Sequence, residues 1–179
     1  MAKTKLVDVE EAKGLTKEVY DDIQKNFGMI PNIFKAYGQR PEILQANWNK
    51  VKAVMVGGKL PRVLKEMIAT TVAAAHDCEY CVRAHGTFVK TLGVAAETVK
   101  TLIEDVDKTD LDEKEKQAIK FAVKAARTPH DVGEADYEQL KSLGYNEEQI
   151  VEILAVMDLF TSFSKFTSAL DIEIDFPEL

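Results

Sequence analysis

Residues 61–93 read PRVLKEMIATTVAAAHDCEYCVRAHGTFVKTLG, and they predict two successive helices. Pro61 suits the start of a helix, because its missing N–H would have no partner there. Apolar side chains then recur at steps of three or four residues, which places them on one helical face: Leu64, Ile68, Val72 and Ala75. Asp77 is the expected N-cap of the second helix, which should run to Leu92 and end at Gly93.

The same signals extend over the rest of the chain. Caps, prolines and stop glycines divide the apolar periodicity into further expected helices: Thr16 (as the cap) to Phe27, Pro41 to about Met55, a short helix to about Asp105, Asp112 to Ala126, Glu134 to Leu143, and Asn146 to about Leu170. No alternation typical of strands lies between turn signals. The sequence therefore predicts an all-α, multihelical fold.

Length and composition predict one domain over residues 1–179, since 46% hydrophobic residues suffice for one core. The net charge of −7, without a basic cluster, argues against nucleic-acid binding. No apolar run approaches the roughly 20 residues of a membrane span. The first eight residues lack an apolar signal stretch. We expect a cytoplasmic protein that binds neither nucleic acid nor membrane.

The chain also resembles itself at an offset of 51 residues, since KTLG at 90–93 recurs as KSLG at 141–144. This predicts two related helical units, 60–108 and 111–159. Most positions shared by the two units are apolar or glycine, which is typical of packing. The polar residues considered next are not shared.

The two cysteines, Cys78 and Cys81, are three residues apart. A disulfide between them would close almost no loop and would add little stability. A small secreted protein would have more cysteines, spread along the chain. Chemistry is therefore the leading explanation of the pair.

Cys78, Cys81 and His85 are spaced to share one helical face. Cys78 is expected in the first turn, where backbone N–H groups favour a thiolate. His85 lies one turn from Cys81 and is placed to take its proton. Glu66, on the preceding helix, is expected to orient His85 or to shuttle its proton. These four residues are the predicted catalytic site.

Other interpretations of these residues stay open. Two thiolates, an imidazole and a carboxylate could bind zinc, although a structural zinc site usually takes a second ligand pair from a distant segment. Alternatively, the cysteines are inert core residues. The last helix carries several large apolar residues: Leu154, Met157, Phe160, Phe163 and Phe166. We expect the phenylalanines to form core or an oligomer surface rather than a ligand pocket, and we expect a homo-oligomer.

The pattern Glu-x11-Cys-x2-Cys-x3-His, here Glu66, Cys78, Cys81 and His85, resembles the AhpD-like alkylhydroperoxidases of the carboxymuconolactone decarboxylase superfamily. The stretches GMIPNIF at 28–34 and LGY at 143–145 resemble its peroxidase-related branch. The resemblance implies an AhpD-like fold, assembly as trimers or hexamers, and a thiol peroxidase recycled by a lipoyl or thioredoxin-like dithiol protein. One departure is Tyr80, where the best-studied alkylhydroperoxidase has a histidine.

The mechanism expected from these residues begins with Cys81, activated by His85 and Glu66, attacking a hydroperoxide and becoming a sulfenic acid. Cys78, expected to be the more exposed cysteine, then forms the disulfide, and an external dithiol restores the pair. No cofactor or metal is expected. The alternatives are a general dithiol–disulfide oxidoreductase, or a zinc-binding or oligomeric scaffold without catalysis.

Overall fold

The computed structural model describes residues 2–179, which form helices and, within that range, no strand. The α-helices are α1 (Gly14–Phe27), α2 (Asn32–Tyr37), α3 (Pro41–Val51), α4 (Arg62–Ala75), α5 (Glu79–Thr91), α6 (Ala96–Glu104), α7 (Glu113–Arg127), α8 (Glu134–Ser142) and α9 (Glu147–Leu170). Three short helices complete the order: η1, a π-helix (Lys52–Val56), and the 3₁₀-helices η2 (Val106–Lys108) and η3 (Pro129–Asp131). The predicted all-α fold is confirmed.

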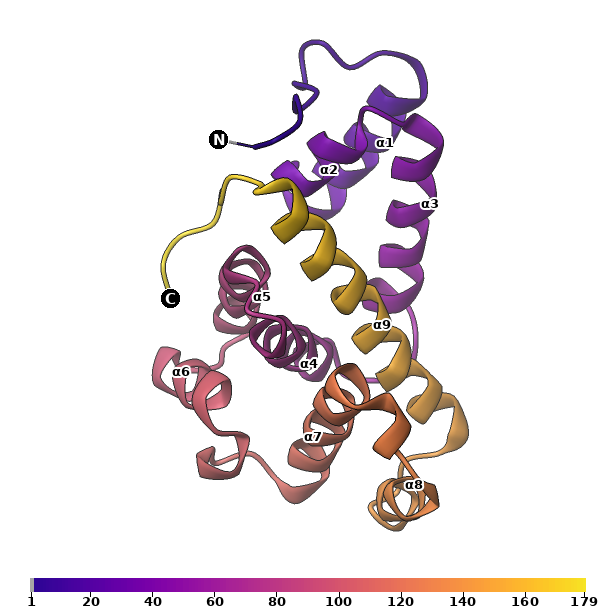
Figure 1. The fold of residues 1–179 in the computed structure, drawn as a ribbon, viewed down its shortest axis with the longest axis vertical. Coiled ribbons are helices and arrows are strands. Elements are labelled where there is room, and N and C mark those ends of the chain that lie inside the picture. Colours follow the sequence, from indigo (N-terminus) through magenta and orange to yellow (C-terminus); the bar gives the residue numbers. More distant parts are fainter. Residues whose placement is uncertain (1) are drawn as a thin grey trace.

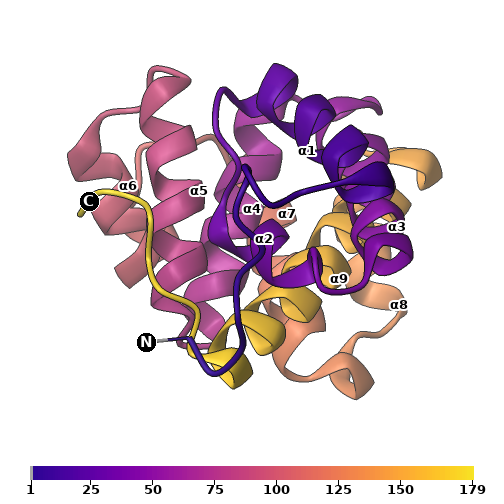
Figure 2. The ribbon, with the colours of Figure 1, turned by 90° about the horizontal axis from the view of Figure 1, so that it is seen from above.

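Helix α9 crosses the middle of the molecule, with α1–α3 at one end and α7 and α8 toward the other (Figure 1). Helix α4 packs against α5, α7 and α9. The view from above shows α5 and α6 on the side opposite α3 and α8 (Figure 2). The buried side chains of these helices form one hydrophobic cluster, which includes Trp48, Met67, Ile119 and Leu159. The α4–α5 pair therefore lies against the central helix.

The turn between α4 and α5 differs from the prediction. Asp77 has a left-handed backbone (φ 54°), and it ends α4 rather than capping α5. The N–H of Cys78 donates to Ala73 O and that of Asp77 donates to Ala74 O, which is the Schellman pattern of a helix end. Cys78 is instead the N-cap of α5, and its sulfur accepts the N–H of Cys81 at 3.3 Å. One sulfur thus takes the place of a capping oxygen.

The predicted cap of the first helix is also wrong. Helix α1 begins at Gly14, and its N-cap, Lys13, makes no side-chain capping hydrogen bond. Thr16 lies inside the helix and is buried. The stop is as predicted, because Gly28 adopts the left-handed conformation (φ 76°) that ends α1.

A buried ion pair between α4 and α9 holds the segment that precedes α4. Lys65, almost fully buried, pairs with Glu152 of α9. Its ammonium also donates to the carbonyl oxygens of Val54, at 2.9 Å, and Gly57. Glu152 in turn accepts the backbone N–H of Lys59 at 2.8 Å. These bonds fix the end of η1 and the start of α4.

The two predicted units have matching helix starts. Helices α4 and α7 begin at Arg62 and Glu113, and α6 and α9 begin at Ala96 and Glu147, both at the predicted offset. The stop glycines Gly93 and Gly144 both have positive φ. The duplication and the single domain stay predictions, and Met1 lies outside the described residues.

The apolar residues of α9 are covered more fully than the sequence suggests. Phe160 and Phe163 are buried within the chain, and Leu154, Met157 and Phe166 are half-buried. The homo-oligomer therefore stays a prediction without support from these side chains. In residues 2–179, no helix combines the length and the apolar character needed to cross a membrane.

Candidate active site

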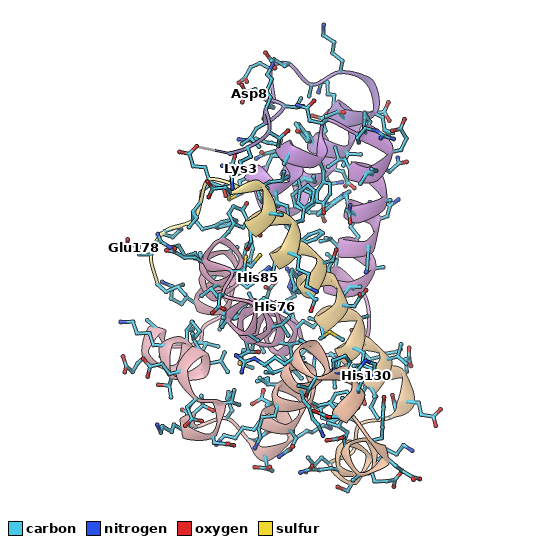
Figure 3. All side chains as sticks on the ribbon, viewed as in Figure 1. Lys3, Asp8, His76, His85, His130 and Glu178 are labelled. Carbon is cyan, nitrogen blue, oxygen red and sulfur yellow. The ribbon has the colours of Figure 1, made fainter. Side chains whose placement is uncertain are left out.

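The four predicted site residues gather around the α4–α5 turn. Glu66 is on α4, Cys78 caps α5, and Cys81 and His85 are on α5. His85 lies beside α9 near the middle of the molecule, whereas His130 lies toward α7 and α8 (Figure 3). The local cause is the short connection between α4 and α5, which brings the side chain of Glu66 beside a residue nineteen positions later.

Glu66 and His85 are in direct contact. The Nδ1 atom of His85 lies 2.6 Å from Glu66 Oε2, so the ring N–H donates to the carboxylate. Glu66 is fully buried, and the side chain of His85 is 13% exposed. This arrangement directs the other ring nitrogen, Nε2, to serve as a proton acceptor or donor. In the described part of the chain, no hydrogen bond joins His85 to Cys81.

Arg62 completes this contact, and the sequence analysis missed it. Its Nε donates to Glu66 Oε1 at 2.7 Å, and one Nη donates to Met55 O at 2.9 Å. The guanidinium balances the charge of a carboxylate that would otherwise be buried with only a histidine as partner. The sequence contained one indication of this ion pair, because Arg62 and Glu66 are four residues apart, which is one helical turn.

Both cysteines are buried, at 2% exposure each, and both are free thiols. The prediction that Cys78 is the more exposed one is therefore wrong, because capping turns its sulfur inward against α9. Thr167 of α9 lies between the two: its hydroxyl oxygen is 3.1 Å from Cys78 Sγ and 3.7 Å from Cys81 Sγ. The dithiol is thus enclosed between the start of α5 and the end of α9.

The surroundings of the two sulfurs separate their acidities. A hydrogen bond from the Cys81 thiol, with others from Thr167 and the Cys81 backbone N–H, holds the pKa of Cys78 well below the usual thiol range, against the effect of burial. The same thiol–thiolate hydrogen bond, together with burial, raises the pKa of Cys81. Cys78 is therefore the more acidic of the two thiols.

An apolar cavity of ≈ 50 Å³ lies beside the dithiol. Cys81, His85, Glu66 and Arg62 line it, but Cys78 does not. Its remaining wall is largely aromatic: Phe27, Phe34, Phe88, Phe160, Phe163 and Phe176. Cys78 instead borders a separate surface hollow with Thr167 and Ser168. The two sulfurs of the dithiol thus border different spaces: Cys81 borders the apolar cavity, and Cys78 borders the surface hollow.

The structure confirms the core interpretation of the last helix. Phe160 and Phe163 are core residues, as expected, and they also line the cavity beside Cys81. Spacing alone gives the face of a helix, but it does not say which part of that face borders a void. Tyr80 is buried, and its hydroxyl accepts the backbone N–H of Ile33 at 3.3 Å.

The zinc interpretation receives no support from the arrangement. Over residues 2–179, no three His, Cys, Asp or Glu side chains are grouped as metal ligands would be. Glu66 and His85 point to each other, and the two sulfurs point to Thr167.

Comparison with known proteins places this site in a family. Residues 41–107 match the carboxymuconolactone decarboxylase family, and this range includes all four predicted site residues. A crystal structure of a peroxidase-related protein from Silicibacter sp. TM1040 is 30% identical, with a TM-score of 0.84 over 97% of this chain and 94% of that one. The chain belongs to the AhpD-like, peroxidase-related proteins of the carboxymuconolactone decarboxylase family. The family resemblance predicted from the motif is confirmed.

Two further proteins are similar to this AhpD-like protein. The alkylhydroperoxidase AhpD core of a peroxidase-related protein from Ralstonia eutropha JMP134 has a TM-score of 0.89 at 23% identity, over 97% of this chain and 92% of that one, and it shows the shared fold. An alkyl hydroperoxide reductase of Mycobacterium tuberculosis is 33% identical over 82 residues. The match covers 46% of this chain but only 24% of that protein.

Proposed function

We propose that this AhpD-like protein is a thiol-dependent peroxidase that reduces organic hydroperoxides through Cys81 and Cys78. The observation that carries the proposal is the shared cavity, in which a cysteine of a dithiol and a carboxylate-bound histidine face the same apolar space. A hydroperoxide needs a sulfur nucleophile on one side and a proton source for its leaving oxygen on the other. The family relationship supports the same chemistry.

Cys81 is the attacking sulfur in this mechanism, because it lines the cavity and Cys78 does not. His85, whose Nδ1–H is held by Glu66, takes the proton of the Cys81 thiol on Nε2 as the peroxide approaches. Cys81 then attacks the terminal peroxide oxygen, the O–O bond breaks, and Cys81 becomes a sulfenic acid. The leaving alkoxide takes this proton from His85 Nε2, and it departs as the alcohol.

Disulfide formation completes the turnover. The Cys78 thiolate attacks the sulfur of the sulfenic acid, and hydroxide leaves as water after it takes one proton from solvent through the Glu66–His85 pair. The protein has then given two electrons to the peroxide. An external dithiol of the lipoyl or thioredoxin-like kind returns them by disulfide exchange, approaching Cys78 from its own surface hollow.

A general dithiol–disulfide oxidoreductase is the second candidate. The lowered pKa of Cys78 favours it, because a thiolate is the attacking species in thiol–disulfide exchange. This function needs neither the cavity nor His85. The two candidates therefore differ in their dependence on the histidine.

The test is a single turnover of the reduced protein with an organic hydroperoxide, and the measured quantity is the rate at which the thiols are lost. His85→Ala should slow this step about 100-fold, the usual contribution of a positioned acid or base. His130→Ala is the matched control, because His130 is exposed and remote from the site. If His85→Ala reacts at the rate of the control while both variants exchange with a disulfide, the oxidoreductase is the better assignment.

A further inference from the structure

The cavity is closed on one side by a segment that is not helical. After α9, residues 172–179 continue without a helix and pass back along α5 (Figure 1). We call this segment the C-terminal strap. It contributes Phe176 to the cavity wall, whereas every other aromatic residue of that wall belongs to α1, α2, α5 or α9.

Few contacts hold the strap in place. Asp175 accepts the backbone N–H of Asn32 at 2.8 Å, and the Asn32 amide donates to Glu173 O at 3.0 Å. Ile172 and Phe176 are the strap's buried apolar side chains. The side chain of Leu179 lies over Gly86 of α5, where an added Cβ would meet it at 2.6 Å. Glu178 also pairs with Arg83 of α5 at 3.5 Å, and the backbone N–H of Ile172 donates to the carbonyl oxygen of Thr167 at 3.1 Å. Among the described residues, no side chain of the strap hydrogen-bonds Glu66, His85 or a cysteine sulfur.

Phe176 lies between the strap and the site. Its ring packs edge-on against Tyr80, with centroids 5.8 Å apart, and against Phe88 at 6.1 Å. Tyr80 directly precedes Cys81, and Phe88 packs on His85 at 6.1 Å. The Phe176 ring therefore covers the wall on which the reacting groups sit, without forming part of their hydrogen-bond network.

The size of the cavity decides what it admits. Its volume is ≈ 50 Å³, whereas a protein cavity that binds benzene measures about 150 Å³. A hydroperoxide with a phenyl group therefore does not fit beside Cys81 while Phe176 is in place. Moving a helical wall residue would disturb the close-packed core, but moving Phe176 requires only that the strap shift.

We propose that Phe176 is the specificity-determining residue of this site: its ring limits the organic group that reaches Cys81, and the strap yields to admit bulkier hydroperoxides. The inference rests on the proposed peroxidase function, and it names the size of substrate that the site selects. The resting protein takes hydrogen peroxide and the smallest alkyl hydroperoxides in preference to aromatic ones.

The test compares two substrates in single turnover, ethyl hydroperoxide and cumene hydroperoxide, and it uses the ratio of their rates. Phe176→Ala should raise the cumene-to-ethyl ratio roughly tenfold or more, since hydrophobic pockets discriminate by about that factor for small differences in size. Phe176→Leu should give an intermediate ratio, and Phe176→Trp should lower it. Phe121→Ala is the matched control, because Phe121 is also a buried phenylalanine but lies on α7 and does not line the cavity.

An equal change of both rates in Phe176→Ala would overturn the proposal, as would the same rise of the ratio in Phe121→Ala. A second readout separates this result from a failure of the peroxidase function. In Cys78→Ser protein, Cys81 is alkylated with iodoacetamide and with an aromatic maleimide, and Phe176→Ala should raise the aromatic-to-small ratio as before. If no hydroperoxide oxidises the wild-type thiols, the proposed peroxidase function is wrong. The alkylation ratio then still shows whether Phe176 limits the size of the molecules that reach Cys81.

Discussion

The division of acidity between the two thiols leads to a quantitative prediction. Replacing Cys81 by alanine removes the hydrogen bond that contributes most to the low pKa of Cys78. A hydrogen bond to a charged group contributes about 1.5–3 kcal/mol, which corresponds to about one to two pKa units. The pKa of Cys78 should rise by that amount in Cys81→Ala. Cys81→Ser should give a smaller rise, because its hydroxyl still donates.

The assay is the ultraviolet absorbance of the thiolate as a function of pH, with protein that carries both Cys78→Ala and Cys81→Ala as the blank. Thr167→Val independently removes the hydroxyl that lies 3.1 Å from the sulfur and that also lowers the pKa of Cys78. The reasoning is refuted if Cys81→Ala leaves the pKa of Cys78 unchanged. The thiolate would then be held by the start of α5, whose dipole contributes about 1 kcal/mol or less.

Three further predictions follow from the same contacts. Arg62→Gln should lower the free energy of unfolding by about 1–3 kcal/mol, because it leaves Glu66 buried without its cation; urea denaturation against the exposed Arg40→Gln measures this, and equal stabilities would contradict it. In reduced protein, the lowered pKa of Cys78 stabilises the fold fully above the unfolded thiol pKa of about 8.5, and this stabilisation is lost as the pH falls through the folded pKa. The difference in free energy of unfolding between wild type and Cys78→Ala should therefore become smaller toward acid pH. A difference that stays constant with pH would contradict this prediction. Cys78→Ser treated once with hydroperoxide should be labelled by dimedone on Cys81, faster than Cys81→Ser is labelled on Cys78; the opposite order would reverse the two roles.

The sequence determined the helical architecture, and it supplied the four candidate site residues. Helix formation depends on neighbours three and four positions apart, so apolar periodicity, prolines and stop glycines such as Gly28 and Gly93 are readable without a structure. The spacing of Cys78, Cys81 and His85 also follows from local geometry. Glu66 came from the family resemblance and from its place on the preceding helix, not from periodicity alone.

Only the tertiary structure decided how those residues are arranged. The left-handed Asp77 shifts the cap of α5 to Cys78, and the packing of α9 supplies Thr167, so the burial and the acidity of the two thiols depend on contacts between residues nearly ninety positions apart. The cavity joins aromatic side chains from both ends of the chain, Phe27 and Phe176 among them. Local patterns do not encode such contacts, because a side chain's spacing fixes the face on which it lies but not what packs against that face.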